Sequence, residues 1–78
     1  MEVTQMAAQN RVAEARNREA ISRAKLAALA GISEQTLKRV EDGTRNVAPL
    51  TKAKIVRGFN NLPNKQREYT REYLFPNG

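Results

Sequence analysis

Four polar side chains at helical spacing carry the clearest chemistry in the sequence: Glu34, Gln35, Lys38 and Arg39. Residues four apart lie on the same face of a helix, so these side chains form one hydrogen-bonding surface. Gln can bond adenine bidentately, Lys and Arg suit guanine, and Glu accepts from the amino group of cytosine. A solvated surface helix carries the same residue types, so the surrounding elements must decide between base recognition and an ordinary exposed face.

Two short helices are predicted to position this surface. The first is capped by Ser22 and runs through "RAKLAALA", and Gly31 stands where a left-handed helix end is expected. The second is capped by Ser33 and ends at Gly43. A short connection containing glycine sets two such helices at a steep crossing, so the sequence predicts a helix-turn-helix. The apolar residues expected to hold the pair together are Leu26, Ala27, Ala30, Ile32, Leu37 and Val40.

Three further helices are predicted from the helix-favouring composition and the missing strand alternation. They cover residues 4–18, 49–60 and 64–74, with Thr4 and Asn64 as N-caps. The inward residues of the helix over 49–60 are expected to be Ala53, Ile55, Val56 and Phe59. The fold class is therefore predicted as all-α with five helices. Residues 1–78 are expected to form one domain with its core in 10–62, and the helix in 64–75 packs on that core or dimerises.

The composition excludes most catalytic chemistry. The chain has 78 residues, which predicts one domain with one modest core. It contains neither cysteine nor histidine, so disulfides, thiolate zinc sites, serine–histidine triads and imidazole acid–base catalysis are excluded. No nucleophile–base pair or metal cluster can be assembled from the remaining residues. We therefore expect a protein that is not an enzyme and needs no cofactor or metal.

The charge of the chain indicates a polyanionic partner. Fourteen Lys and Arg against eight Asp and Glu give a formal charge of +6, and nucleic acid is the commonest partner of so basic a domain. A basic protein without such a partner and a ligand of acidic membranes are the alternatives. No segment approaches the ~18 apolar residues of a membrane span. Because the start of the chain also lacks the pattern of an export signal, a cytoplasmic protein is expected.

The segment "ISRAKLAALAGISEQTLKRVEDGTRN" resembles the helix-turn-helix of the phage Cro and repressor family, often called the XRE family. The resemblance extends over about residues 10–62 and includes Arg16 upstream and Ile55 and Phe59 downstream. It implies a compact lambda-repressor-like domain that binds double-stranded DNA. The matched residues within the segment are Ile21, Leu26, Ala27, Gly31, Ile32, Ser33, Thr36, Val40, Glu41 and Gly43.

The resemblance also implies a role for each matched position. The residues implied to contact bases are the four outward polar residues of the second helix, Glu34, Gln35, Lys38 and Arg39. Thr36 is implied to face partly inward. Arg16 and Glu41 are implied to form a structural ion pair and not to contact DNA. Asp42 departs from the family pattern, and the sequence leaves open whether it caps locally or pairs with Arg45. The residues implied to contact DNA phosphates are Ser22, Arg23, Arg45 and Asn46.

The C-terminal segment "NKQREYTREYLFPNG" allows two interpretations. Its apolar side chains either close the small core or form the surface of a homodimer, which would present two recognition helices across a two-fold axis. The half-sites on DNA would then lie about 34–36 Å apart. The residues concerned are Tyr69, Tyr73, Leu74 and Phe75.

Together these patterns predict a sequence-specific double-stranded DNA-binding protein that represses transcription, of the kind found in phages and mobile elements. Within DNA binding, the alternatives are an architectural excision factor, a plasmid-maintenance factor or an antitoxin that binds its own promoter. A protein-interaction module that uses the same fold without DNA is the alternative from another class. Steep salt dependence of duplex binding separates these classes.

Overall fold

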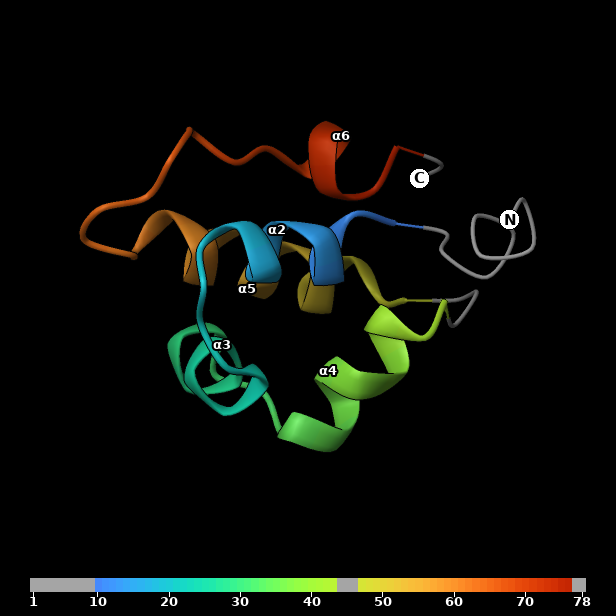
Figure 1. Cartoon of the computed structure of the whole chain (residues 1–78). Helices are drawn as coiled ribbons and strands as arrows, with labels where there is room; N and C mark the ends of the chain where they lie inside the picture. Colours follow the sequence, from blue (N-terminus) through green and yellow to red (C-terminus); the bar gives the residue numbers. More distant parts are fainter. Residues whose placement is uncertain (1–9, 44–46, 77–78) are drawn as a thin grey trace, which may run out of the picture.

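The computed structural model describes residues 10–43 and 47–76 of the chain. The predicted Thr4 cap, the residues of the first predicted helix that precede Asn10, and the predicted phosphate contacts Arg45 and Asn46 lie outside this part. The described residues contain no strand, so the all-α prediction is confirmed. Their five helices, shown in Figure 1, are α2 (Val12–Arg18), α3 (Arg23–Ala30), α4 (Glu34–Glu41), α5 (Pro49–Asn60) and α6 (Arg71–Leu74).

Helix α2 begins later than the sequence predicted, because Asn10 and Arg11 are not helical. The Asn10 side chain accepts from the amide of Val12 at 3.0 Å, and its own amide donates to a carbonyl of α4. The amide of Arg11 donates to the carbonyl of Leu74 at 2.9 Å. Tertiary hydrogen bonds therefore hold these two residues out of the helix that the local sequence favours.

Helices α3 and α4 form the predicted helix-turn-helix. Ser22 accepts from the amide of Lys25, and Ser33 accepts from the amide of Thr36, so both predicted serine caps are confirmed. Gly31 ends α3 with φ +73°, the left-handed conformation for which glycine costs least. Its amide donates to the carbonyls of Ala27 and Ala28, and this closes α3 two residues before the Ser33 cap.

The interior of the helix pair contains the apolar residues expected from the sequence. Ile32 is half-buried and packs against the core. Each large apolar side chain removed from water contributes about 1.5–3 kcal/mol, so this face orients α4 within the domain. The fully buried members are Leu26, Ala27, Ala30, Leu37 and Val40.

Helix α5 packs closely against α3. A Cβ atom added to Gly58 would lie 3.0 Å from the backbone nitrogen of Ala30, so only glycine permits this approach of the two helices. Ile55 and Phe59 are buried and Val56 is half-buried, as predicted. The prediction for Ala53 is wrong: it is exposed, because it lies on the solvent face of α5.

The predicted helix over residues 64–74 is wrong over most of its length, since only α6 is helical and Thr70 is its N-cap. Side chains from elsewhere take the backbone groups that a longer helix would use. Asn60 exchanges two hydrogen bonds with the backbone of Tyr69, at 2.8 and 2.9 Å. The carboxylate of Glu19 accepts from the amide of Gln66 at 2.8 Å. These bonds hold the segment in a non-helical conformation.

The C-terminal aromatic residues close this core. The Tyr69 ring lies 4.8 Å from the Phe59 ring between centroids, and its hydroxyl donates to Glu19. Tyr69, Leu74 and Phe75 are buried in the chain's own interior, and only Tyr73 is partly exposed. Three of the four residues therefore belong to the chain's own core, as the core-closure interpretation expects, and homodimerisation stays a prediction. None of the helices in residues 10–43 and 47–76 is long and apolar enough to cross a membrane.

Candidate nucleic-acid interface

The outer face of α4 carries the polar residues that the sequence predicted for base contact. This face lies opposite Leu37 and Val40, which are buried. Because the apolar side of α4 is fixed in the core, its polar side faces solvent without obstruction from the chain's own interior. The exposed residues are Glu34, Gln35, Lys38 and Arg39.

Asp42, which departs from the family pattern, pairs with Lys38. The Lys38 Nζ atom lies 3.0 Å from Asp42 Oδ2, and the two side chains are 58% and 60% exposed. An exposed pair four residues apart contributes only about 0.3–0.5 kcal/mol. The ammonium group can therefore leave the carboxylate at little cost when another acceptor comes within reach.

Ser22 stands at the N-terminus of α3, where the sequence predicted a phosphate contact. Its hydroxyl is exposed and accepts from the amide of Lys25 at 3.0 Å, so its role within the chain is to cap α3. The other amides of the first turn point out of the helix end, and such groups favour an anion. Capping by the side chain leaves these amides available to a phosphate.

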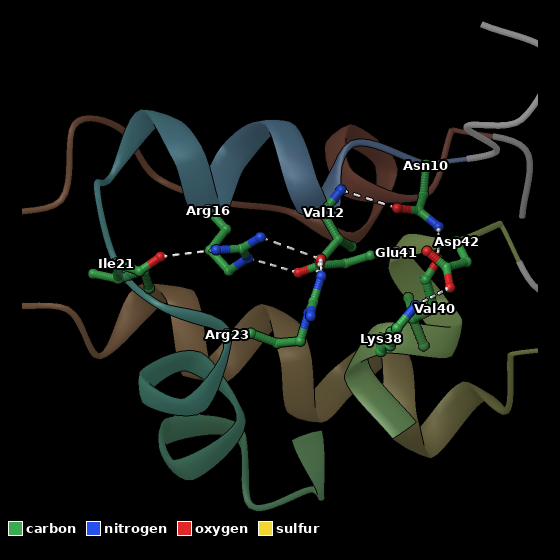
Figure 2. A network of polar contacts seen from close by, with 9 residues as sticks. All are labelled: Asn10, Val12, Arg16, Ile21, Arg23, Lys38, Val40, Glu41 and Asp42. Atoms are coloured by element: carbon green, nitrogen blue, oxygen red, sulfur yellow. Dashed lines mark hydrogen bonds and ion pairs between the residues drawn. The ribbon is translucent and has the colours of Figure 1, made fainter. Parts of the chain in front are cut away.

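Arg16 and Glu41, implied to be an ion pair, are in contact. Arg16 Nε donates to Glu41 Oε2 at 2.7 Å and Nη2 donates to Oε1 at 3.3 Å, while Nη1 bonds the carbonyl of Ile21 (Figure 2). The Glu41 side chain is only 3% exposed and that of Arg16 is 16% exposed. A carboxylate so far removed from water requires charged partners, because an unpaired buried charge is strongly destabilising.

Arg23 also bonds Glu41, which the sequence analysis missed. Its Nε and Nη2 atoms both lie 3.2 Å from Glu41 Oε1, the oxygen that also accepts from Arg16 Nη2 (Figure 2). The Arg23 side chain is 36% exposed, so the part of the guanidinium that does not face Glu41 can reach a ligand in solvent. The structure thus places the predicted phosphate contact and the predicted structural pair in one network.

Asn10 extends this network at the C-terminal end of α4. Its Nδ2 atom donates to the carbonyl of Val40 at 2.8 Å, which is one of the last carbonyls of the helix (Figure 2). Three side chains from outside α4 therefore hold this end of the helix, and the Ser33 cap defines the other end. The sequence offered one signal for Asn10, since asparagine is a preferred residue where helices begin. The sequence offered no signal for the contact between Arg23 and Glu41, because that contact depends on how α3 crosses α4.

The arrangement defines a helix-turn-helix protein: a short capped helix, a glycine turn, and a second helix with an apolar inner face and a polar outer face. A family model described as Helix-turn-helix matches residues 12–63. The chain therefore belongs to this family, the Cro and repressor type that its sequence resembles, and it is a DNA-binding protein of the kind that regulates transcription. Searches among curated proteins and among solved structures found no significant match.

Proposed function

We propose that this chain is a sequence-specific repressor of the phage or mobile-element type, which acts by occupying a promoter. The observation that carries the proposal is the geometry of α4. Its polar face is exposed, its apolar face is buried, and both of its ends are held by hydrogen bonds. A rigidly held helix with exposed polar groups fits the major groove of duplex DNA.

In the proposed complex, α4 enters the major groove and its first turn comes closest to the base edges. Gln35 would bond adenine, Lys38 and Arg39 would bond guanine, and Glu34 would accept from cytosine. The phosphate contacts are assigned to Ser22, Arg23, Arg45 and Asn46. Phosphate contacts supply much of the affinity and base contacts supply the selectivity.

The protein would act by binding alone, without catalysis or a cofactor, in the cytoplasm of a prokaryotic cell or of a phage-infected host. Occlusion of a promoter requires only a long-lived complex at the correct sequence. Two copies on a palindromic site would place their α4 helices about 34–36 Å apart. Of the residues predicted for a dimer surface, Tyr69, Leu74 and Phe75 are buried within the chain, which leaves Tyr73 as the partly exposed one.

Selection of bound duplexes from a random pool tests the proposal. We expect enrichment of one sequence, and binding to it that weakens steeply between about 50 and 200 mM salt. A palindromic product would indicate a symmetric dimer, which sedimentation of the complex can verify. Salt-dependent binding without enrichment would favour an architectural role instead, and no duplex binding at all would favour a protein-interaction module.

A further inference from the structure

Three arginines surround the side chain of Tyr73, on a part of the molecule that the proposed DNA contacts do not use. The guanidinium carbons of Arg67 and Arg11 lie 3.8 and 4.9 Å from the centroid of the Tyr73 ring. Arg18 Nη1 donates to the Tyr73 hydroxyl at 2.6 Å. All three arginines are exposed and the tyrosine is half-buried. We call these four residues the Tyr73 cluster.

The positive charge of the Tyr73 cluster is only partly neutralised. Arg18 pairs with Glu14 at 3.2 Å, across an exposed surface. Within the described part of the chain, no carboxylate forms an ion pair with Arg11 or Arg67. Contacts with the ring and with backbone carbonyls orient these two guanidinium groups while leaving their charge uncompensated.

The Tyr73 cluster lies away from the recognition helix. Its residues come from the two ends of α2, from α6 and from the segment before α6. Figure 1 shows α6 on one side of α2, with α3 and α4 on the other. A straight duplex in contact with the outer face of α4 would therefore leave the Tyr73 cluster free to meet a different segment of nucleic acid.

We propose that the Tyr73 cluster is a second polyanion-binding site, which takes the phosphate backbone of another duplex segment without reading its sequence. The planar guanidinium fork matches a phosphate bidentately, and arginines stacked on an aromatic ring are already ordered for that contact. A chain that binds its operator through α4 would then join two stretches of DNA. The proposal extends the proposed function, but it does not depend on the base contacts of α4.

Amide chemical shifts in the full chain test where a duplex binds. We expect a short duplex of unrelated sequence, added to excess, to move the signals of Arg11, Arg67 and Tyr73 in addition to those of α4. Movement at α4 alone overturns the second site and leaves the proposed function standing. Movement at the Tyr73 cluster alone supports the second site and contradicts the proposed function.

A pair of matched variants tests whether the Tyr73 cluster matters beyond total charge. Arg11→Gln with Arg67→Gln removes two charges from the cluster, and Lys65→Gln with Arg71→Gln removes two charges from the same part of the chain outside it. We expect only the first variant to abolish the shifts at Tyr73 and to lower the salt slope of second-duplex binding by about two units. Equal effects of both variants would show that binding depends on the total positive charge and not on the Tyr73 cluster, and this would overturn the proposal.

Polyglutamate distinguishes a nucleic acid from an acidic protein as the occupant. The probe offers carboxylates in place of phosphates, and we expect it to move the Tyr73 signals only at much higher concentration than the duplex does. Equal or tighter binding of polyglutamate would overturn the assignment of the site to a nucleic-acid backbone.

Discussion

Arg23 donates two hydrogen bonds, from Nε and from Nη2, to the same oxygen of Glu41. The contact joins the start of α3, where a phosphate is expected, to the end of α4, whose face is expected to read bases. A group that holds a phosphate with one part of its guanidinium and Glu41 with another would fix the position of α4 relative to the DNA backbone. Phosphate contacts set the register of a bound protein in this way.

The contacts of Glu41 with Arg16 and Arg23 predict an order for the stability lost when each residue is replaced by alanine. Glu41→Ala removes the carboxylate from two arginines and should lower the free energy of unfolding by about 3–5 kcal/mol. Arg16→Ala should cost less than this, since Arg23 continues to pair with Glu41. Arg23→Ala should cost least, about 1 kcal/mol or below, because solvent screens its 36% exposed side chain. Urea unfolding measures all three, and similar small losses would contradict a structural role for the network.

Gln35→Ala should change which sequences are preferred, at a cost of about 1–3 kcal/mol at one base pair. Because the side chain is exposed, the free energy of unfolding should stay within about 0.5 kcal/mol of the parent value. Selection from a random pool, repeated with the variant, measures the change. Ala28→Ser, at an exposed position on α3, serves as a control that should preserve the parent preference. Uniform weakening on all duplexes by Gln35→Ala would show that α4 does not read bases.

Arg23→Ala should weaken binding to every duplex sequence and lower the salt slope by about one unit, as the loss of one phosphate contact requires. Because the same substitution removes the ion pair with Glu41, the free energy of unfolding of the variant must be measured together with its DNA binding. Arg23→Lys keeps the charge but not the planar fork, so it should retain the slope better than the alanine variant does. An unchanged salt slope in Arg23→Ala would show that Arg23 contacts Glu41 but no phosphate.

Ala20→Gly should stabilise the chain. Ala20 has φ +57° in the turn between α2 and α3, a conformation that costs an L-residue roughly 1–2 kcal/mol. Glycine removes that strain but has more freedom in the unfolded chain, so a net gain of about 0.5–1 kcal/mol is expected. Ala28→Gly is the matched control, since it lies inside α3 and should lose about 1 kcal/mol. A rise in the melting temperature for the first variant and a fall for the second would support the assignment.

The raised pKa of Tyr69 predicts that the fold loses stability at high pH. Burial, together with the hydrogen bond to Glu19, raises the pKa of Tyr69 from 10.0 to about 12. Because the folded-state pKa lies above the unfolded one, the neutral hydroxyl stabilises the fold below pH 10, and this contribution is lost as the pH rises to about 12. Urea midpoints across this range should fall more steeply for the parent chain than for Tyr69→Phe. A parallel fall in the parent and in Tyr69→Phe would contradict the assignment.

The helix-turn-helix was predictable because its signals are local. Ser22 and Ser33 cap helices through backbone groups three residues away, and Gly31 adopts a left-handed conformation within the same turn. The exposure of Gln35 follows from the spacing of Leu37 and Val40 on a single helix. None of these features needs a partner from a distant part of the chain.

The C-terminal segment was not predictable for the opposite reason. Its helix-forming residues between Asn64 and Thr70 are not helical, because the side chains of Asn60 and Glu19 bond two backbone amides and one carbonyl there. Both side chains come from other elements of the fold. The choice between a closed core and a dimer surface for Tyr69 depended in the same way on which neighbours the fold supplied.

Local sequence was therefore sufficient for the caps, the turn and the outward face of α4, since each depends on backbone geometry and helical period within a few residues. Long-range packing was needed to bring Arg23 to Glu41, to bury Tyr69 and to assemble three arginines around Tyr73. The contacts of Arg23 with Glu41, and of Arg18 and Arg11 with Tyr73, join residues 18 to 62 positions apart, and their energies depend on helix crossings that no short stretch of the chain contains.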